Sequence, residues 1–181
     1  MKKLLFIILL GVGMQLNAQV YKSKSGKVSF FSKTPVENIS AVNATSVQCA
    51  IDTKKKSVLV LIKVNGFKFE KPLMEEHFNE KYLETDKYTD AMFKGTIIGD
   101  VNYTKDGIYK VKSEGTFTLH GVAKPRTFEG TIEVKKGEVI LHSKFNVKLV
   151  DHNIEVPAVV TEKIAEVIEV DVNFTLALLK K

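Results

Sequence analysis

Most of the chain alternates apolar and polar residues with a period of two, a pattern typical of strands that bury one face and expose the other. The clearest runs span residues 109–119, 126–134, 139–149 and 168–178. In the first of them, Phe117 and Leu119 lie on one face, and Lys112 and Thr118 lie on the other. Sheets with one wet face are usually antiparallel, so the pattern predicts an antiparallel all-β fold.

One segment departs from this alternation in favour of a helical period. Within residues 72–83, Met74, Phe78 and Tyr82 recur every four positions among acidic and polar residues, which predicts a short helix. A proline at the start of the segment suits a first helical turn. The segment 157–164 admits a second helical turn, although its apolar residues give no clear period.

Short turn signals separate the runs, and Asp106-Gly107 and Lys136-Gly137 favour tight hairpins. About eight successive strands would leave exposed edges unless the sheet closes into a barrel. The interior of such a barrel is either filled with side chains or holds one small ligand, and the pattern leaves both alternatives open. No repeat or linker divides the sequence, so we expect a single barrel domain over residues 19–181.

The first eighteen residues have the layout of a secretory signal peptide. Lys2 and Lys3 precede an apolar run over residues 4–12, and the small residue Ala18 follows. The run is too short for a transmembrane helix, which needs about 20 apolar residues. We expect cleavage after Ala18 and an exported protein, periplasmic or secreted, with no integral membrane span; an uncleaved N-terminal anchor is the alternative.

Composition and charge narrow the range of functions. The chain has 181 residues, of which 44% are hydrophobic and 27% are charged, and its formal net charge is +6. Two of these charges, Lys2 and Lys3, leave with the signal peptide, which lowers the net charge to +4. The remaining lysines are interleaved with glutamates, and Arg126 is the single arginine, so no basic footprint for nucleic acid is present.

Residues with obvious chemistry are few. Cys49 is the single cysteine, which excludes an internal disulfide and a cysteine-built metal site. The four histidines form no metal-ligand spacing, and no catalytic or nucleotide-binding motif is present. We therefore expect no catalytic residue, no metal and no cofactor. The one acid–base set on offer is His77 with Glu75 or Glu76.

Two segments resemble the YceI-like family. The first comprises Met74-Glu75-Glu76-His77-Phe78, the following residues 82–88, and Met92-Phe93-Lys94-Gly95. The second, residues 115–125, reads G-T-F-T-L-H-G-V-A-K-P. The family often has arginine at position 74 and proline at position 89, so this chain departs from it there. The resemblance implies an exported, lipocalin-like antiparallel barrel with a long apolar pore that binds a polyisoprenoid or another amphiphilic lipid.

The resemblance favours a cavity over a filled core, and the inward strand faces then supply the candidate lining. These residues are Phe117, Leu119, Phe128, Ile132, Leu141, Phe145, Val172, Phe174 and Leu176. The candidate mouth of the pore comprises Met74, His77, Phe78, Tyr82, His120 and Lys124. The two histidines could hydrogen-bond a polar head group, or they could hold the helix or a turn to backbone carbonyls.

The function that follows is storage or transport of a lipid by burial, without catalysis. Two alternatives stay open at this stage. The same pocket could serve an enzyme that acts on a small lipid, or a filled barrel could bind a protein on its outer face. The protein could also form a homodimer.

The signal peptide gives the first testable prediction. Mass spectrometry of the N-terminal peptide of the exported protein should identify Gln19 as the first residue, because the small residue before it is the cleavage signal. An exported protein that still begins at Met1 would contradict the prediction.

Overall fold

Ten antiparallel strands make up most of the computed structural model, which describes residues 19–157 and 163–179. The strands are β1 Val20–Lys33, β2 Asn38–Asn43, β3 Val47–Asp52, β4 Ser57–Lys63, β5 Lys68–Phe69, β6 Asp90–Ile98, β7 Gly107–Leu119, β8 Val122–Lys135, β9 Glu138–Lys148 and β10 Val167–Leu178. The helical segments are η1 Val64–Gly66, α1 Pro72–His77, the π-helical turn η2 Phe78–Tyr82, and η3 Leu149–His152. The predicted signal peptide lies outside the described residues.

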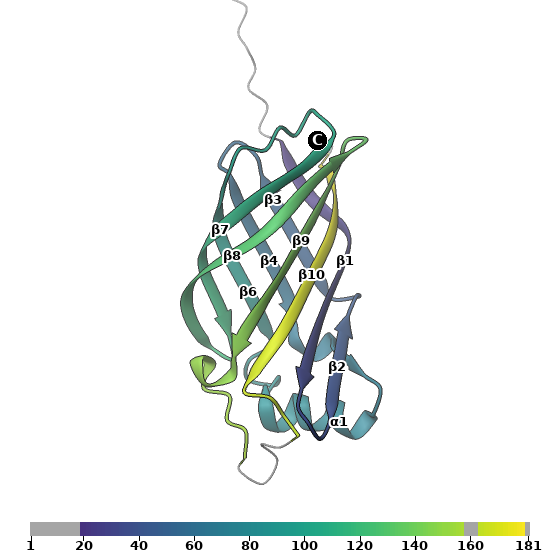
Figure 1. The fold of residues 1–181 in the computed structure, drawn as a ribbon, viewed down its shortest axis with the longest axis vertical. Helices are drawn as coiled ribbons and strands as arrows, with labels where there is room; N and C mark the ends of the chain where they lie inside the picture. Colours follow the sequence, from purple (N-terminus) through teal and green to yellow (C-terminus); the bar gives the residue numbers. More distant parts are fainter. Residues whose placement is uncertain (1–18, 158–162, 180–181) are drawn as a thin grey trace, which may run out of the picture.

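Eight of the strands close into a barrel, which confirms the predicted fold class (Figure 1). Neighbours follow the order β10-β9-β8-β7-β6-β4-β3-β1, and β1 pairs with β10 to complete the circle. The pairing of β1 with β10 runs from Tyr21 opposite Leu178 to Phe31 opposite Glu169. All pairings in the barrel are antiparallel, as the one-faced alternation predicts.

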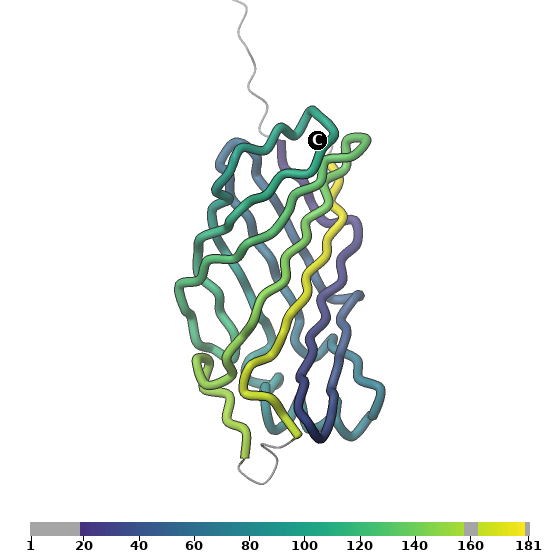
Figure 2. Tube along the Cα trace, in the orientation of Figure 1, coloured from purple at the N-terminus to yellow at the C-terminus, as the bar shows by residue number. Residues whose placement is uncertain are grey.

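On one side β1 pairs with β10, whereas on the other side its neighbour changes along its length. This change opens one end of the barrel. Near its start β1 pairs with β3, from Val20 opposite Asp52, whereas from Val28 onward it pairs with β2. The hairpin of β1 and β2, with α1 behind it, forms the lower end of the molecule in Figure 2, where the same trace is drawn as a tube. We call this end the open end and the opposite one the packed end.

The helical expectation is confirmed for residues 72–82, which form α1 and η2. The second expected helical turn, over residues 157–164, falls largely outside the described residues. None of the helices in the described ranges is long and apolar enough to cross a membrane.

The packed end is filled by apolar side chains from the inward strand faces. Ile51, Ile132 and Leu176 are fully buried there, and Phe174 lies among them. The loop between β6 and β7 adds Tyr103, whose ring stacks on Tyr21 with centroids 5.7 Å apart. Burial of Tyr103 raises the pKa of its hydroxyl to about 12.

Glycine is required where β6 and β7 approach each other closely. Gly95 and Gly115 are paired across these strands. A Cβ added at Gly115 would overlap the Lys94 carbonyl and the Gly95 Cα, both of which are backbone atoms that cannot swing aside. The Phe93 ring covers Gly95 from the same strand.

This contact predicts that Gly115→Ala lowers the free energy of unfolding by about 2 kcal/mol, because the two strands must separate to admit the methyl group. Gly107→Ala is the matched control, since its nearest neighbour would lie 3.4 Å away, an ordinary contact distance. Chemical denaturation of both variants measures the difference. Equal stability of the two variants would contradict the role given to Gly115.

Candidate ligand-binding site

Four phenylalanines from separate elements meet at the open end of the barrel. They are Phe30 on β1, Phe67 after η1, Phe69 on β5 and Phe78 at the start of η2. The Phe78 ring lies 5.5 Å from the Phe30 ring and 5.0 Å from the Phe69 ring, centroid to centroid. This mouth cluster brings the helical segment into contact with the barrel wall.

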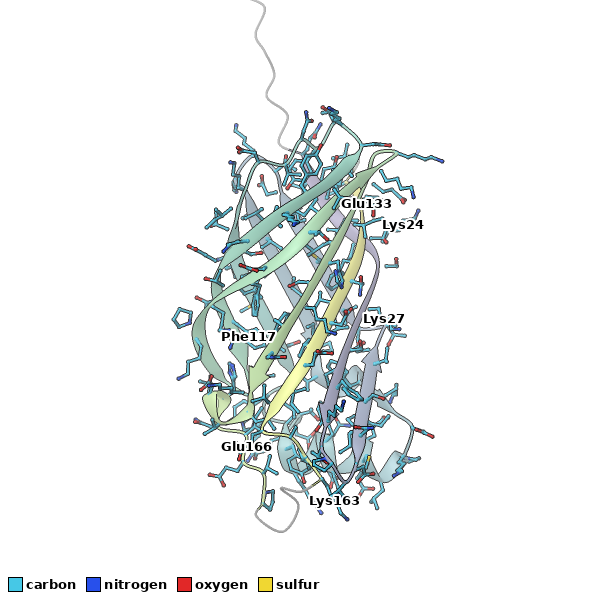
Figure 3. All side chains as sticks on the ribbon, in the orientation of Figure 1. Lys24, Lys27, Phe117, Glu133, Lys163 and Glu166 are labelled. Carbon is cyan, nitrogen blue, oxygen red and sulfur yellow. The ribbon has the colours of Figure 1, made fainter. Side chains whose placement is uncertain are left out.

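A pocket of about 330 Å³ lies outside the mouth cluster, between α1, the β1–β2 hairpin and the chain leading into β10. Its wall is mainly apolar, and its polar groups include Glu37, Lys71, His77 and Lys163. Figure 3 shows Lys163 at this end of the molecule. Glu37 and Lys71 form an ion pair of 2.9 Å, which lowers the pKa of the Glu37 carboxyl. We call this pocket the mouth pocket.

A second cavity of about 110 Å³ lies on the inner side of the mouth cluster, and every residue that lines it is apolar. Phe30, Phe78, Leu83, Leu149, Ile154 and Ile168 line both the mouth pocket and this inner cavity. The two spaces therefore share one wall of side chains, and the inner cavity is reached from the open end.

A third, smaller cavity of about 60 Å³ lies deeper in the barrel. It shares Ile62, Phe117 and Phe145 with the inner cavity, so these side chains form a constriction between the two. Phe128 packs against Phe145, with ring centroids 4.2 Å apart, and against Phe117 at 5.8 Å. Together the three spaces follow the axis of the barrel from its open end.

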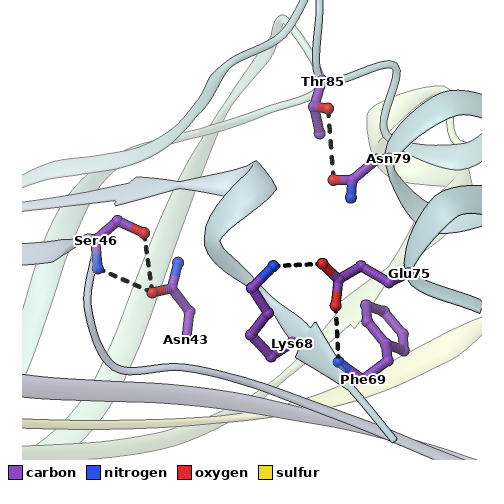
Figure 4. A network of polar contacts seen from close by, with 7 residues as sticks. All are labelled: Asn43, Ser46, Lys68, Phe69, Glu75, Asn79 and Thr85. Atoms are coloured by element: carbon purple, nitrogen blue, oxygen red, sulfur yellow. Dashed lines mark hydrogen bonds and ion pairs between the residues drawn. The ribbon is translucent and has the colours of Figure 1, made fainter. Parts of the chain in front are cut away.

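Polar contacts hold the helical segment in place over the open end (Figure 4). One carboxylate oxygen of Glu75 pairs with the Lys68 ammonium, and the other accepts a hydrogen bond of 3.3 Å from the Phe69 amide. Thr85 donates through its hydroxyl to the Asn79 side chain, at 3.4 Å. These contacts join α1 and η2 to β5 and to the segment before β6.

Buried Asn43 fixes the nearby turn between β2 and β3. Its side-chain oxygen accepts hydrogen bonds from the Ser46 amide and hydroxyl, each at 3.1 Å, as Figure 4 shows. Its side-chain amide donates to the Lys63 carbonyl at 2.8 Å. The turn is thereby tied to the end of β4, beside the mouth cluster.

His120 joins the two segments that carry the family resemblance. Its Nδ1 donates to the main-chain oxygen of His152 at 3.1 Å, and its Nε2 lies 3.1 Å from a carboxylate oxygen of Glu84. The Tyr88 ring packs edge-on against the imidazole, with centroids 4.3 Å apart. Gly121 follows with a φ of +72°, and a Cβ there would lie 2.6 Å from the Tyr88 ring. These contacts give His120 a structural role in the β7–β8 turn.

His152 is the second buried histidine of this region. Its Nδ1 donates to the Val122 carbonyl at 3.2 Å, and its ring packs against Phe117 with centroids 5.2 Å apart. Its Nε2 has no hydrogen-bond partner among the described residues. Burial lowers the pKa of His152 below its ordinary value, which keeps the ring neutral.

The structure places the other sequence-predicted site residues in different parts of the barrel. Phe117, Leu119, Phe128, Leu141, Phe145 and Val172 line the inner cavity or the deeper one. Met74, His77, Phe78 and Tyr82 line the mouth pocket. Ile132, Phe174 and Leu176 lie in the packed end and line none of these spaces, and Lys124 is exposed on β8.

Several residues that line the inner cavity were not among those predicted from the sequence. Val28 and Phe30 lie on one face of β1, and their period-two spacing is a signal that could have found them. Phe67 and Ile154 lie in short irregular segments, where no periodicity distinguishes an inward side chain from an outward one. Ala91 is too small to stand out as apolar lining.

The structure shows how the titratable side chains near the site are engaged. The Glu75 carboxylate is engaged by Lys68 and the Phe69 amide, and among the described residues His77 has no carboxylate partner. No cluster of three metal-ligating side chains occurs within the described ranges. Burial also raises the pKa of the Cys49 thiol to about 12, so its thiolate does not form near neutral pH.

The lowered pKa of His152 predicts a stability that falls as the pH decreases. Below about pH 6.5 the unfolded chain takes up a proton on this residue, whereas the folded protein does not, so protonation favours unfolding. Between pH 7.5 and 5.5 we expect the free energy of unfolding to fall by about 1 kcal/mol. This fall should be absent in His152→Gln. It should persist in the control His77→Gln, whose substituted residue is partly exposed. Denaturation curves at both pH values measure it, and an unchanged loss in His152→Gln would contradict this assignment.

We compared the chain with protein families and with curated proteins. A family model described as a YceI-like domain matches residues 19–176. No curated protein matches the chain.

Solved structures share the fold at low sequence identity. A polyisoprenoid binding domain from Saccharophagus degradans is 14% identical, with a TM-score of 0.75 over 88% of this chain and 98% of that chain. BcnA from Burkholderia cenocepacia is 18% identical, with a TM-score of 0.69 over 83% and 95%. The YCEI protein of Campylobacter jejuni is 19% identical, with a TM-score of 0.56 over 75% and 81%. With its matching motifs, barrel and family model, the chain belongs to the YceI-like family.

Proposed function

We propose that this protein binds a polyisoprenoid or a similar amphiphilic chain in the barrel and stores or transports it outside the cytoplasm, in the periplasm or as a secreted protein. The observation that carries the proposal is the inner cavity, whose lining is entirely apolar and which adjoins the mouth pocket. The similarity to a polyisoprenoid binding domain from another organism supports the same class of ligand.

The driving force is removal of hydrocarbon from water. Apolar surface transferred into an apolar site gains roughly 25 cal/mol per Å². A preformed barrel gains this energy without having to fold around the ligand, because the strand ladder already fixes its wall. A cavity without polar lining offers nothing to a charged or strongly hydrated guest, which selects for a hydrocarbon chain.

The polar end of an amphiphile would remain in the mouth pocket. Lys71, Lys163 and His77 offer hydrogen-bond donors there, and Glu37 offers an acceptor. Aromatic and aliphatic side chains continue inward from this polar rim, so a single bound molecule would change from wet to dry surroundings along its length. This gradient matches an amphiphile better than a uniformly apolar guest.

Entry requires the mouth cluster to rearrange. Phe30 and Phe78 belong to the lining of both the mouth pocket and the inner cavity. Phe78 begins η2, a π-helical turn, and such turns occur frequently at functional sites. Movement of this turn, rather than of the barrel strands, would admit the chain at the smallest cost in hydrogen bonds.

Native mass spectrometry of the purified protein tests the proposal. We expect the mass of a copurifying lipid, or uptake of added farnesol or geranylgeraniol in a one-to-one complex. The same spectrum gives the oligomeric state and so tests whether the protein forms a homodimer. A protein that rejects every added isoprenol would refute lipid binding and favour a protein-interaction module. Release of a chemically altered lipid would favour the enzyme alternative.

Ala91→Leu separates ligand binding from stability. Ala91 is buried on β6 and lines the inner cavity, so a leucine there occupies the space proposed for the ligand. The variant should be more stable by about 1 kcal/mol, because it fills a void, and should bind isoprenols at least about tenfold more weakly. Thermal denaturation and isoprenol titration measure the two effects.

Ala41→Leu is the matched control for this prediction. Ala41 is buried on β2 and lines neither the inner cavity nor the mouth pocket. The same added volume should overpack this position and lower stability by about 1–3 kcal/mol, with affinity unchanged in the folded fraction. If Ala91→Leu lost stability and kept its affinity, the inner cavity would not be the binding site.

A further inference from the structure

The apolar path through the barrel ends well before the packed end. The lining side chains run from Leu149, the first residue of η3 beside the mouth pocket, along β9 to Leu141 at the deepest cavity. On β10 they run from Ile168 to Val172. The next inward residues on β10, Phe174 and Leu176, are fully buried and line none of these cavities. The site is therefore a blind pocket.

Phe174 closes the path because β1 leaves space for its ring. A Cβ added at Gly26 would overlap two ring atoms of Phe174 and would also approach Val47 within 2.9 Å. Gly26 is paired with Phe174 across β1 and β10. The ring thus lies over the glycine backbone inside the barrel, with fully buried Ile132 and Ile51 in the same packed end. We call Val172 and Phe174 the floor of the pocket.

The depth of the pocket follows from strand geometry. Leu149 and Leu141 are eight positions apart in the sequence. At about 3.3 Å per residue and a strand tilt of about 40°, this segment spans about 20 Å along the barrel axis. An extended chain advances about 1.1–1.2 Å per bond, as in extended peptide backbone. An isoprene unit contributes four bonds along the chain, so about four units fill the depth.

We propose that the floor formed by Val172 and Phe174 sets the length of the bound chain, so that the pocket accepts about four isoprene units and leaves any further units at the mouth. The inference rests on the proposed function, because it specifies the ligand of the same site. The mouth pocket is the space that remains for the end of a longer chain.

The test is a titration of the full protein with isoprenols of increasing length. Farnesol, geranylgeraniol, geranylfarnesol and hexaprenol carry three, four, five and six isoprene units. Affinity should rise by about tenfold or more from three units to four, because each buried methylene adds a few-fold to the binding constant. From four units to six it should change by less than about threefold, because the added carbons bury no further surface.

Two floor variants change the depth in opposite directions. Val172→Phe fills the deepest cavity, so its affinity should stop rising at three units or fewer. Phe174→Ala removes the ring that closes the path, so affinity should continue to rise to five or six units. Thermal denaturation verifies that each variant is folded, and because the two act in opposite directions, failure of one to fold leaves the other decisive.

Ile108→Phe is the control for the floor variants. Ile108 lies on β7 and is 71% exposed, so a phenylalanine there adds the same kind of side chain outside the pocket. Its length profile should equal that of the unaltered protein.

Three outcomes distinguish failure of the proposed chain-length limit from failure of the proposed lipid binding. A plateau near four units that moves with the floor variants supports the proposed limit. Binding whose length profile has no plateau, or whose plateau stays fixed in both floor variants, overturns it and leaves the proposed function intact. Absence of binding at every length overturns the proposed function itself.

Discussion

The pairing of β1 with β10 closes the sheet, so that the inward faces of eight strands surround one interior. Because β1 leaves β3 and joins β2 from Val28 onward, the closed circle is maintained at one end and opened at the other. The packed end, the mouth pocket and the position of α1 all follow from this change of partner.

Inward-facing side chains pack differently at the two ends of the barrel. Near the packed end, Ile132, Phe174 and Leu176 are fully buried, and glycine at position 26 leaves room for the Phe174 ring next to its backbone. Toward the open end, rings such as Phe117 and Phe145 meet at angles and leave spaces between them. Large side chains alone therefore do not fill a barrel, because their packing depends on the stagger of the strands.

This dependence explains how far the sequence could predict the site. Period-two alternation identified the inward faces correctly, so Phe117, Phe145 and Val172 were found on the strands that form the cavities. It could not tell that Phe174 lies in a filled layer two positions further along β10, because depth depends on which residues of other strands lie opposite. Phe67 and Ile154 carry no periodic signal, because their segments are irregular.

The histidines illustrate the same limit. The sequence left a head-group role and a structural role open for His120, and its contacts with His152 and Glu84 favour the structural one. His152 is fully buried against Phe117, because η3 folds back over the start of β8. Neither contact is encoded locally, since each joins residues about thirty positions apart.

A hydrocarbon chain that enters the barrel from its open end would lie against the side chains of the inner cavity. The most direct measurement is the set of intermolecular nuclear Overhauser contacts between protonated geranylgeraniol and a deuterated protein that carries protonated methyl groups. We expect contacts to the methyl groups of Leu119, Val147 and Val170, which line the inner cavity, and none to Leu176 in the packed end. Contacts confined to exposed methyl groups such as those of Leu73 and Val36, with the inner cavity silent, would contradict this expectation.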